Sequence, residues 1–145
     1  MQDFPHHYEI VATADPEGDV SITGDRLDAI SSAPPTEFGG PGDRWSPETL
    51  LVAAIADCFV LSFRAIARAS KLSWLSLICK VDGKLERADG KTKFTAFEVH
   101  ATLRVPEDTN ADRAHRILEK AEESCLVTNS LNGSIHLEAE VQSVS

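Results

Sequence analysis

The chain has 145 residues, of which 42% are hydrophobic and 26% are charged, and its formal net charge is −9. That length fits one domain with a sizeable core, and the negative charge argues against nucleic acid or an anionic membrane as partner. Three cysteines are an odd count, so a disulfide framework of the secreted type is not expected. The N-terminal residues show no signal-peptide pattern, and we expect a cytoplasmic protein.

The first third of the chain predicts strands. Alternating apolar and polar residues with turn signals between them indicate a three-stranded antiparallel meander over residues 7–32. The following segment, 33–43, holds three of the seven prolines and three of the eight glycines. It is predicted to be a loop, and a loop of this length in a compact domain is often functional.

A helix is predicted to start at Ser46, with Pro47 in the first helical position and Glu48 in the first turn. No helix breaker follows until about Lys71, which gives roughly 25 residues and about 37 Å of helix. The first half is apolar on nearly every face, as in a buried helix. Its apolar stretch, residues 50–63, is shorter than the roughly 20 residues that span a bilayer.

The rest of the chain alternates strand and helix signals. A strand from residue 75 to 85, a hairpin turn at 88–91 and a return strand over 94–105 are predicted. An exposed amphipathic helix then runs from Thr109 to Glu123, and a terminal strand covers 134–144. The order β-β-β-α-β-β-α-β predicts a single α+β domain over residues 1–145.

The cysteines are the main candidates for chemistry. Cys58 lies within the apolar helix, where a thiol is commonly an inert core group with a raised pKa. To act as a nucleophile it needs a cation or a hydrogen-bond donor from elsewhere in the fold. Cys125 follows the amphipathic helix and is either an ordinary boundary residue or a partner for Cys58. Cys79 shares the apolar face of a strand and is expected in the core.

The other candidate residues carry weaker signals. A structural role is sufficient to explain Glu48, because an acidic residue in the first turn stabilises the helix N-terminus. Ten residues of helix separate it from Cys58 by about 15 Å and a turn of roughly 280°, so it cannot touch Cys58 of the same straight helix. The five histidines share no metal-ligand spacing, and no nucleotide-binding or serine-hydrolase motif is present.

Two segments resemble the OsmC/Ohr family of small thiol-dependent hydroperoxide reductases. Residues 39–59 are similar to the family's glycine-rich loop, Asn-Pro-Glu helix start and alanine-rich helix that ends in Cys-Phe, with Ser46 in place of the asparagine. Cys125, followed by Thr-Asn-Ser-Leu, is similar to the second-cysteine segment. Both segments occur in the family's order, and the predicted elements fit over essentially the whole chain.

The resemblance implies an interwoven homodimer, in which the central helices are buried between six-stranded sheets built from both chains. It implies that Cys58 is the peroxidatic thiolate and Cys125 the resolving thiol. It also implies that Glu48 pairs with an arginine that steadies the thiolate. The usual arginine positions are occupied by other residues here, so Arg44 is the favoured substitute and Arg26 the alternative.

The resulting hypothesis is an organic hydroperoxide reductase that forms a Cys58 sulfenic acid and then a Cys58–Cys125 disulfide. It requires no cofactor or metal, only an external dithiol reductant such as a lipoyl-type donor. One alternative is a non-peroxidatic binding protein for a small hydrophobic or thiol ligand, with redox-responsive cysteines. The other is a purely structural role for all three thiols.

Overall fold

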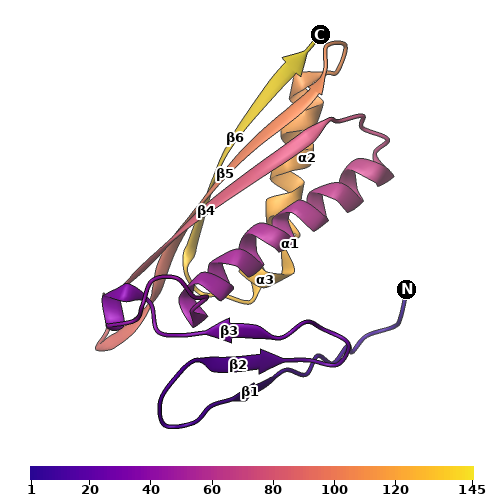
Figure 1. Ribbon diagram of the computed structural model, residues 1–145. Helices are drawn as coiled ribbons and strands as arrows, with labels where there is room; N and C mark the ends of the chain where they lie inside the picture. Colours follow the sequence, from indigo (N-terminus) through magenta and orange to yellow (C-terminus); the bar gives the residue numbers. More distant parts are fainter. The chain divides into compact units, whose positions relative to one another are not determined.

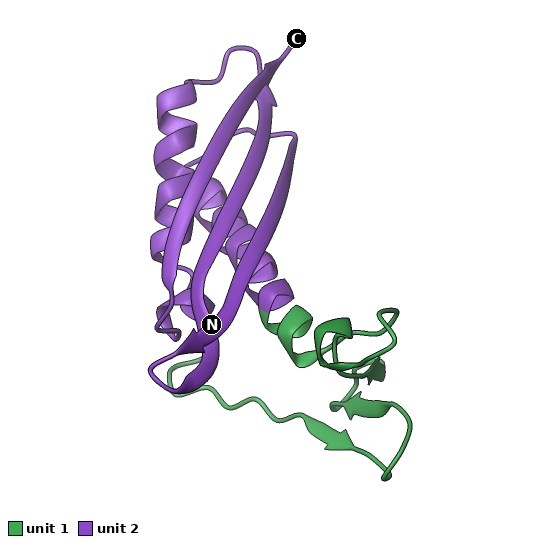
Figure 2. Cartoon of the chain, turned by 90° about the vertical axis from the view of Figure 1, so that its left-hand side faces the viewer, with its two compact units in different colours: residues 1–51 green, residues 52–145 purple.

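The structure is a computed structural model that describes all 145 residues (Figure 1). Its elements are β1 (Val11–Thr13), β2 (Val20–Thr23), β3 (Ile30–Ser32), η1 (Thr36–Phe38), α1 (Pro47–Ala69), β4 (Ser76–Ala88), β5 (Lys91–Pro106), α2 (Ala111–Glu123), α3 (Leu126–Asn129) and β6 (Ser134–Val144). The chain divides into two compact units, unit 1 (Met1–Leu51) and unit 2 (Val52–Ser145), which Figure 2 colours separately. The order of the major elements confirms the predicted α+β class.

Unit 1 contains a small antiparallel sheet in the order β1-β2-β3. Ala12 pairs with Ile22 and Ser21 pairs with Ser31, so the predicted three-stranded meander is confirmed. The strands are only three or four residues long. The turn between β1 and β2 contains Gly18 at a φ of 95°, a conformation that glycine adopts without steric cost.

The loop after β3 is closed by backbone contacts at its two ends. The Ala33 N–H donates to the Trp45 carbonyl at 2.8 Å, next to a bridge between Ser32 and Trp45. Between these ends the chain forms the single turn η1. The predicted loop is therefore an anchored connection that leads directly into α1.

Reciprocal hydrogen bonds fix the start of α1. The Thr49 N–H donates to Ser46 Oγ at 3.1 Å, and the Ser46 N–H donates to Thr49 Oγ1 at 2.8 Å. Ser46 is buried, and its hydroxyl satisfies an N–H group that has no partner within the helix. The predicted helix start is confirmed, and the helix ends at Ala69, two residues before the predicted Lys71.

Unit 2 is built on a second three-stranded sheet in the order β4-β5-β6. The central strand β5 pairs antiparallel with β4 and parallel with β6. Asp89 and Gly90 connect β4 to β5 with φ values of 54° and 76°. Positive φ at both positions is the signature of a two-residue type I′ hairpin, so the turn predicted from the sequence is confirmed.

The core of unit 2 lies between this sheet and the helices. Figures 1 and 2 show α2 and the unit 2 part of α1 on the same face of the sheet. Every second residue of β5 from Phe97 to Val105 is buried, and α1 and α2 each bury one stripe of residues. The buried residues are Phe97, Val99, Ala101, Leu103 and Val105 of β5, Ile55, Phe59, Phe63 and Ala67 of α1, and Ala114, Ile117, Leu118 and Ala121 of α2.

The other faces of α1 keep a large apolar surface. The helix has an 18-residue stretch with a mean hydropathy of 2.1, and only 22% of that stretch is buried. By length and composition alone it could cross a membrane, a property that core helices share. Leu61 on this surface is 50% exposed. The chain by itself therefore leaves apolar area on α1 that a partner surface could cover.

Two features differ from the sequence-based description. Each unit holds a three-stranded sheet, and the six-stranded sheet implied by the resemblance needs a second chain. The short helix α3 was not predicted. It follows Cys125, whose side chain makes no capping hydrogen bond, and it is only four residues long, so it carries no helical periodicity.

Candidate active site

Cys58 lies near the middle of α1, beside the stripe that packs into the core of unit 2. The thiol is partly buried, between the buried residues Ile55 and Phe59 and the exposed face of the helix. One turn further along, Ser62 places its Oγ 4.0 Å from Cys58 Sγ. Cys58 is thus neither sealed in the core nor fully open to solvent.

The segment after α2 brings Cys125 and the start of α3 to Cys58. The backbone N–H groups of Val127 and Leu126 act as hydrogen-bond donors to the Cys58 sulfur, and so does the Cys125 thiol. Cys125 is 1% exposed, and the Thr128 hydroxyl donates to its backbone carbonyl at 3.1 Å. The fold therefore brings together the two cysteines that the sequence analysis singled out. Both are free thiols here rather than a disulfide.

The two thiols have opposite electrostatic environments. Burial raises the pKa of Cys58, but the donors from Val127, Cys125, Ser62 and Leu126 together outweigh burial, and the net pKa lies below the ordinary value. Burial raises the pKa of Cys125, and the nearby Cys58 raises it further. Proton loss is therefore favoured at Cys58, while Cys125 keeps its proton and donates it toward the Cys58 sulfur.

Cys79 was expected in the core, but the structure leaves it at the edge of the buried residues. It lies on β4 opposite Ala101 of β5 and is half-buried. Burial, with a smaller contribution from Cys125, raises its pKa to about 11. A thiol with this pKa is almost entirely protonated at neutral pH and is a poor nucleophile.

Alkylation by iodoacetamide over a pH series should resolve these three environments. The thiolate is the reacting form, so the rate at each cysteine rises with pH through its pKa. We expect Cys58 to reach half its maximal rate at a lower pH in the native protein than in the unfolded chain, and Cys79 only near pH 11. Peptide mass mapping separates the sites. The same pH series in denaturant is the control, and there the three cysteines should react at similar rates. If Cys79 reacts first in the native protein, the assignment is contradicted.

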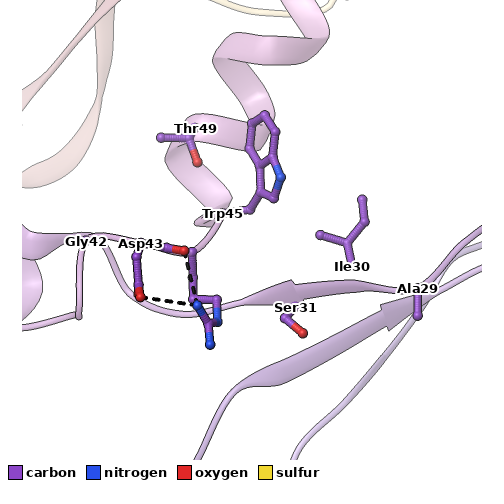
Figure 3. Close-up of a pocket in the computed structure, with 8 residues that line it drawn as sticks. Ala29, Ile30, Ser31, Gly42, Asp43, Trp45 and Thr49 are labelled. Carbon is purple, nitrogen blue, oxygen red and sulfur yellow. Dashed lines mark hydrogen bonds and ion pairs between the residues drawn. The ribbon is translucent and has the colours of Figure 1, made fainter.

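Glu48 and Arg44 lie in unit 1. The Arg44 Nε donates to Asp19 Oδ2 at 2.8 Å, and its Nη1 donates to the Asp43 carbonyl oxygen at 3.2 Å. The carboxylate of Asp19, and to a smaller extent that of Asp43, raises the pKa of Arg44. Arg44 lines an open pocket of about 700 Å³, in which Figure 3 shows Asp43, Trp45 and Thr49 on one side and residues 29–31 on the other.

Several residues of the site were missed by the sequence analysis. Val127 and Leu126 act through backbone N–H groups, and no pattern of residue types identifies such donors. Ser62 had a usable signal, because a residue four positions after Cys58 on a helix shares its face. No group of three histidine, cysteine or acidic side chains has an arrangement suited to a metal ion.

Comparison with known proteins gives consistent matches. A family model described as OsmC-like protein matches residues 40–140. The uncharacterized protein YmaD of Bacillus subtilis (strain 168) is 26% identical over 121 residues, which cover 81% of this chain and 79% of YmaD.

Two solved structures illustrate the likeness of the fold. An OsmC-like protein from Vibrio cholerae has a TM-score of 0.84 at 19% identity, covering 93% of this chain and 99% of that chain. A Legionella pneumophila protein named organic hydroperoxide resistance protein OsmC has a TM-score of 0.75 at 26% identity, covering 97% and 99%.

The segment that matches the family model includes the start of α1, Cys58 and Cys125, and it spans most of the chain. The strands and helices found in unit 2 lie within or close to the same segment. The agreement of sequence and fold over this length leads to one conclusion: the chain belongs to the OsmC-like protein family.

Proposed function

We propose that this protein is a thiol-dependent peroxidase that reduces organic hydroperoxides to alcohols. The observation that carries the proposal is that Cys125 and the start of α3 meet the Cys58 sulfur, an arrangement that lowers the pKa at Cys58 and raises it at Cys125. A nucleophile must be a thiolate, whereas a resolving thiol can remain protonated until the nucleophile is oxidised. Family membership and the name of the Legionella pneumophila relative support the same reaction class.

The proposed first step is attack of the Cys58 thiolate on the distal oxygen of the hydroperoxide. The O–O bond breaks, the oxygen remains on sulfur as a sulfenic acid, and the departing alkoxide takes up a proton to become the alcohol. The peroxide is reduced by two electrons, and the sulfur is oxidised by two electrons. The exposed apolar side chain of Leu61, about one turn from Cys58 on α1, favours an organic peroxide over hydrogen peroxide.

In the second step Cys125 attacks the Cys58 sulfenic acid. A sulfur–sulfur bond forms, and the sulfenic oxygen leaves as water with the Cys125 proton. The two sulfur atoms, which now interact as hydrogen-bonding thiols, have to approach to about 2.05 Å. An external dithiol then reduces the disulfide by thiol–disulfide exchange and becomes oxidised itself, which restores both thiols.

The backbone donors matter because other residues occupy the positions where the family usually has its arginine. The N–H groups of Val127 and Leu126 supply part of the stabilisation that a guanidinium would otherwise provide to the Cys58 thiolate. We retain Glu48 and Arg44 as proposed supporting residues. An Arg44→Gln variant in which Cys58 is alkylated as fast as in the wild type would remove Arg44 from this role.

The proposed enzyme is a homodimer. The supporting observation is the apolar surface of α1, of which less than a quarter is buried by the chain's own residues. A second copy that covers this surface would bury it as the resemblance implies. Sedimentation equilibrium should then give a mass near twice 15.7 kDa, and a mass of one chain at micromolar concentration would contradict the dimer.

The proposed reaction is tested with the reduced wild-type protein and one equivalent of cumene hydroperoxide, without added reductant. We expect one cumyl alcohol per chain and loss of two thiols, with Cys58 and Cys125 linked in the peptide map. If no peroxide is consumed, the peroxidase proposal is wrong and the binding-protein alternative remains. That alternative expects a Cys58 pKa near or above the ordinary value, and the lowered pKa favours the enzyme.

A further inference from the structure

Residues 125–131, which include the resolving thiol and α3, make hydrogen bonds of two kinds. One kind is local, as where the Ser130 hydroxyl donates to the Leu126 carbonyl at 2.8 Å. The other kind reaches α1, because the N–H groups of Leu126 and Val127 donate to the Cys58 sulfur. The local bonds can move together with the segment, whereas the bonds to Cys58 tie the segment to α1.

The strength of the bonds to Cys58 depends on the oxidation state of its sulfur. In the reduced protein the fold favours the thiolate of Cys58, and charge-assisted hydrogen bonds are about twice as strong as neutral ones. In a Cys58–Cys125 disulfide the same sulfur carries no charge and is a weak acceptor. Formation of the disulfide therefore weakens the link between residues 125–131 and α1.

A thiolate that reduces the disulfide can attack either sulfur, and the two choices differ in their leaving group. Attack at Cys125 expels Cys58, whose lowered pKa makes it the better leaving group. Attack at Cys58 expels Cys125, whose pKa is raised, first of all by burial. The leaving groups thus favour attack at Cys125. However, Cys125 is only 1% exposed in the reduced protein, so an external thiolate reaches it only after the segment moves.

We propose that formation of the disulfide releases residues 125–131 from α1, so that the external dithiol attacks Cys125 and regenerates the Cys58 thiolate. This inference rests on the proposed peroxidase cycle, in which the disulfide is an intermediate. The segment closes again when the Cys58 thiolate is restored, because the N–H groups of Leu126 and Val127 regain their charged acceptor.

The proposed reduction balances in two exchange steps. The first thiolate of the reductant forms a bond to Cys125 Sγ, the Cys58–Cys125 bond breaks, and its electron pair leaves on Cys58 Sγ. The second thiol of the reductant then attacks the reductant's own sulfur in the mixed disulfide, and its proton passes to the departing Cys125 thiolate. The reductant leaves as a disulfide, oxidised by two electrons, and the protein disulfide is reduced by two electrons.

Amide hydrogen exchange of the full chain, measured by mass spectrometry, tests the release of the segment. The disulfide is made with diamide, so this measurement needs no peroxide. Peptides that cover residues 125–131 should exchange roughly tenfold faster in the disulfide form than in the reduced form, about the effect of losing one charge-assisted hydrogen bond. Peptides from residues 111–120 of α2 should exchange equally in both forms and serve as the internal reference.

Cys58→Ala tests the same link without oxidation, because it removes the acceptor of both N–H groups. It should raise the exchange of residues 125–131 roughly tenfold as well. Cys79→Ser is the matched control, since it removes a thiol of β4 that lies outside the donor set around Cys58. It should leave the exchange at the level of the reduced wild type. The α2 peptides show whether each variant is folded.

A monothiol identifies which sulfur is attacked. The disulfide form is mixed with 2-mercaptoethanol, the reaction is stopped with acid at early times, and the free thiols are alkylated before peptide mapping. We expect the mercaptoethanol adduct on Cys125 and the alkyl label on Cys58, in at least about tenfold excess over the reverse arrangement.

The proposal is overturned if residues 125–131 exchange at the same rate or more slowly in the disulfide form, or if the adduct lies mainly on Cys58. It is also overturned if diamide forms no Cys58–Cys125 disulfide. A protein that opens on oxidation but consumes no hydroperoxide would contradict the proposed function and support this inference. Hydroperoxide turnover without the opening would contradict this inference alone.

Discussion

Replacing Cys58 by serine is expected to lower the rate of organic hydroperoxide reduction at least about 1,000-fold. Serine keeps the size of the side chain, but its hydroxyl is far less acidic than a thiol and is not activated here by a general base. The donors from Val127 and Leu126 stabilise a thiolate, and at neutral pH they cannot ionise an alcohol. The decay of cumene hydroperoxide in the presence of excess dithiol measures the loss.

Cys79→Ser is the matched control for this experiment. Cys79 has a pKa of about 11 and lies outside the donor set around Cys58, so its replacement should leave the rate within about twofold. Circular dichroism and thermal melts on both variants show whether folding is preserved. Equal rates for Cys58→Ser and the wild type would assign the peroxide consumption to another thiol or to the reductant alone.

Replacing Cys125 by serine is expected to separate the two steps of the reaction. The serine hydroxyl can still donate a hydrogen bond to the Cys58 sulfur, so the first step should continue at a rate close to that of the wild type. No disulfide can then form, and the reaction should stop after one peroxide per chain with a sulfenic acid on Cys58. Without reductant, dimedone, which traps sulfenic acids, should label Cys58 quantitatively. With excess dithiol, which can reduce the sulfenic acid slowly, steady-state turnover should fall about tenfold or more.

Cys125→Ala provides the comparison, because alanine removes both the resolving thiol and its hydrogen bond to Cys58. Loss of that donor raises the pKa of Cys58, so the first step at neutral pH should be slower in Cys125→Ala than in Cys125→Ser. Stopped-flow measurement of the first turnover gives both rates. A wild-type steady-state rate in Cys125→Ser, with no dimedone adduct, would show that Cys125 does not resolve the intermediate.

The secondary structure followed closely from local patterns in the sequence. The alternation in β5 and the Asp89–Gly90 turn are strong sequence signals, because each depends on a few adjacent residues. Ser46 at the start of α1 is a signal of the same local kind. The helix α3 escaped prediction because four residues show no periodicity and its first residue, Cys125, makes no side-chain cap.

The site could be predicted only in part. Cys58 and Cys125 were candidates from their positions in the chain, but on residue type alone each could equally have been an inert cysteine. Their assignment to different chemical roles depends on donors that approach Cys58 from a segment far along the chain. Similarly, the sequence offered Arg44 as a free cation, whereas the fold pairs it with Asp19, 25 residues earlier.

The α+β order, the capped apolar helix that carries Cys58 and the resemblance to the OsmC/Ohr family could all be inferred from the amino-acid sequence. These depend on periodicity, capping residues and motif order, all of which are local properties of the sequence. The difference in acidity between the two thiols, and the burial of a Glu48 carboxylate oxygen without a donor, follow instead from the tertiary fold. Burial and hydrogen bonding are properties of three-dimensional surroundings, and they set the pKa of a thiol and the cost of an unpaired acceptor.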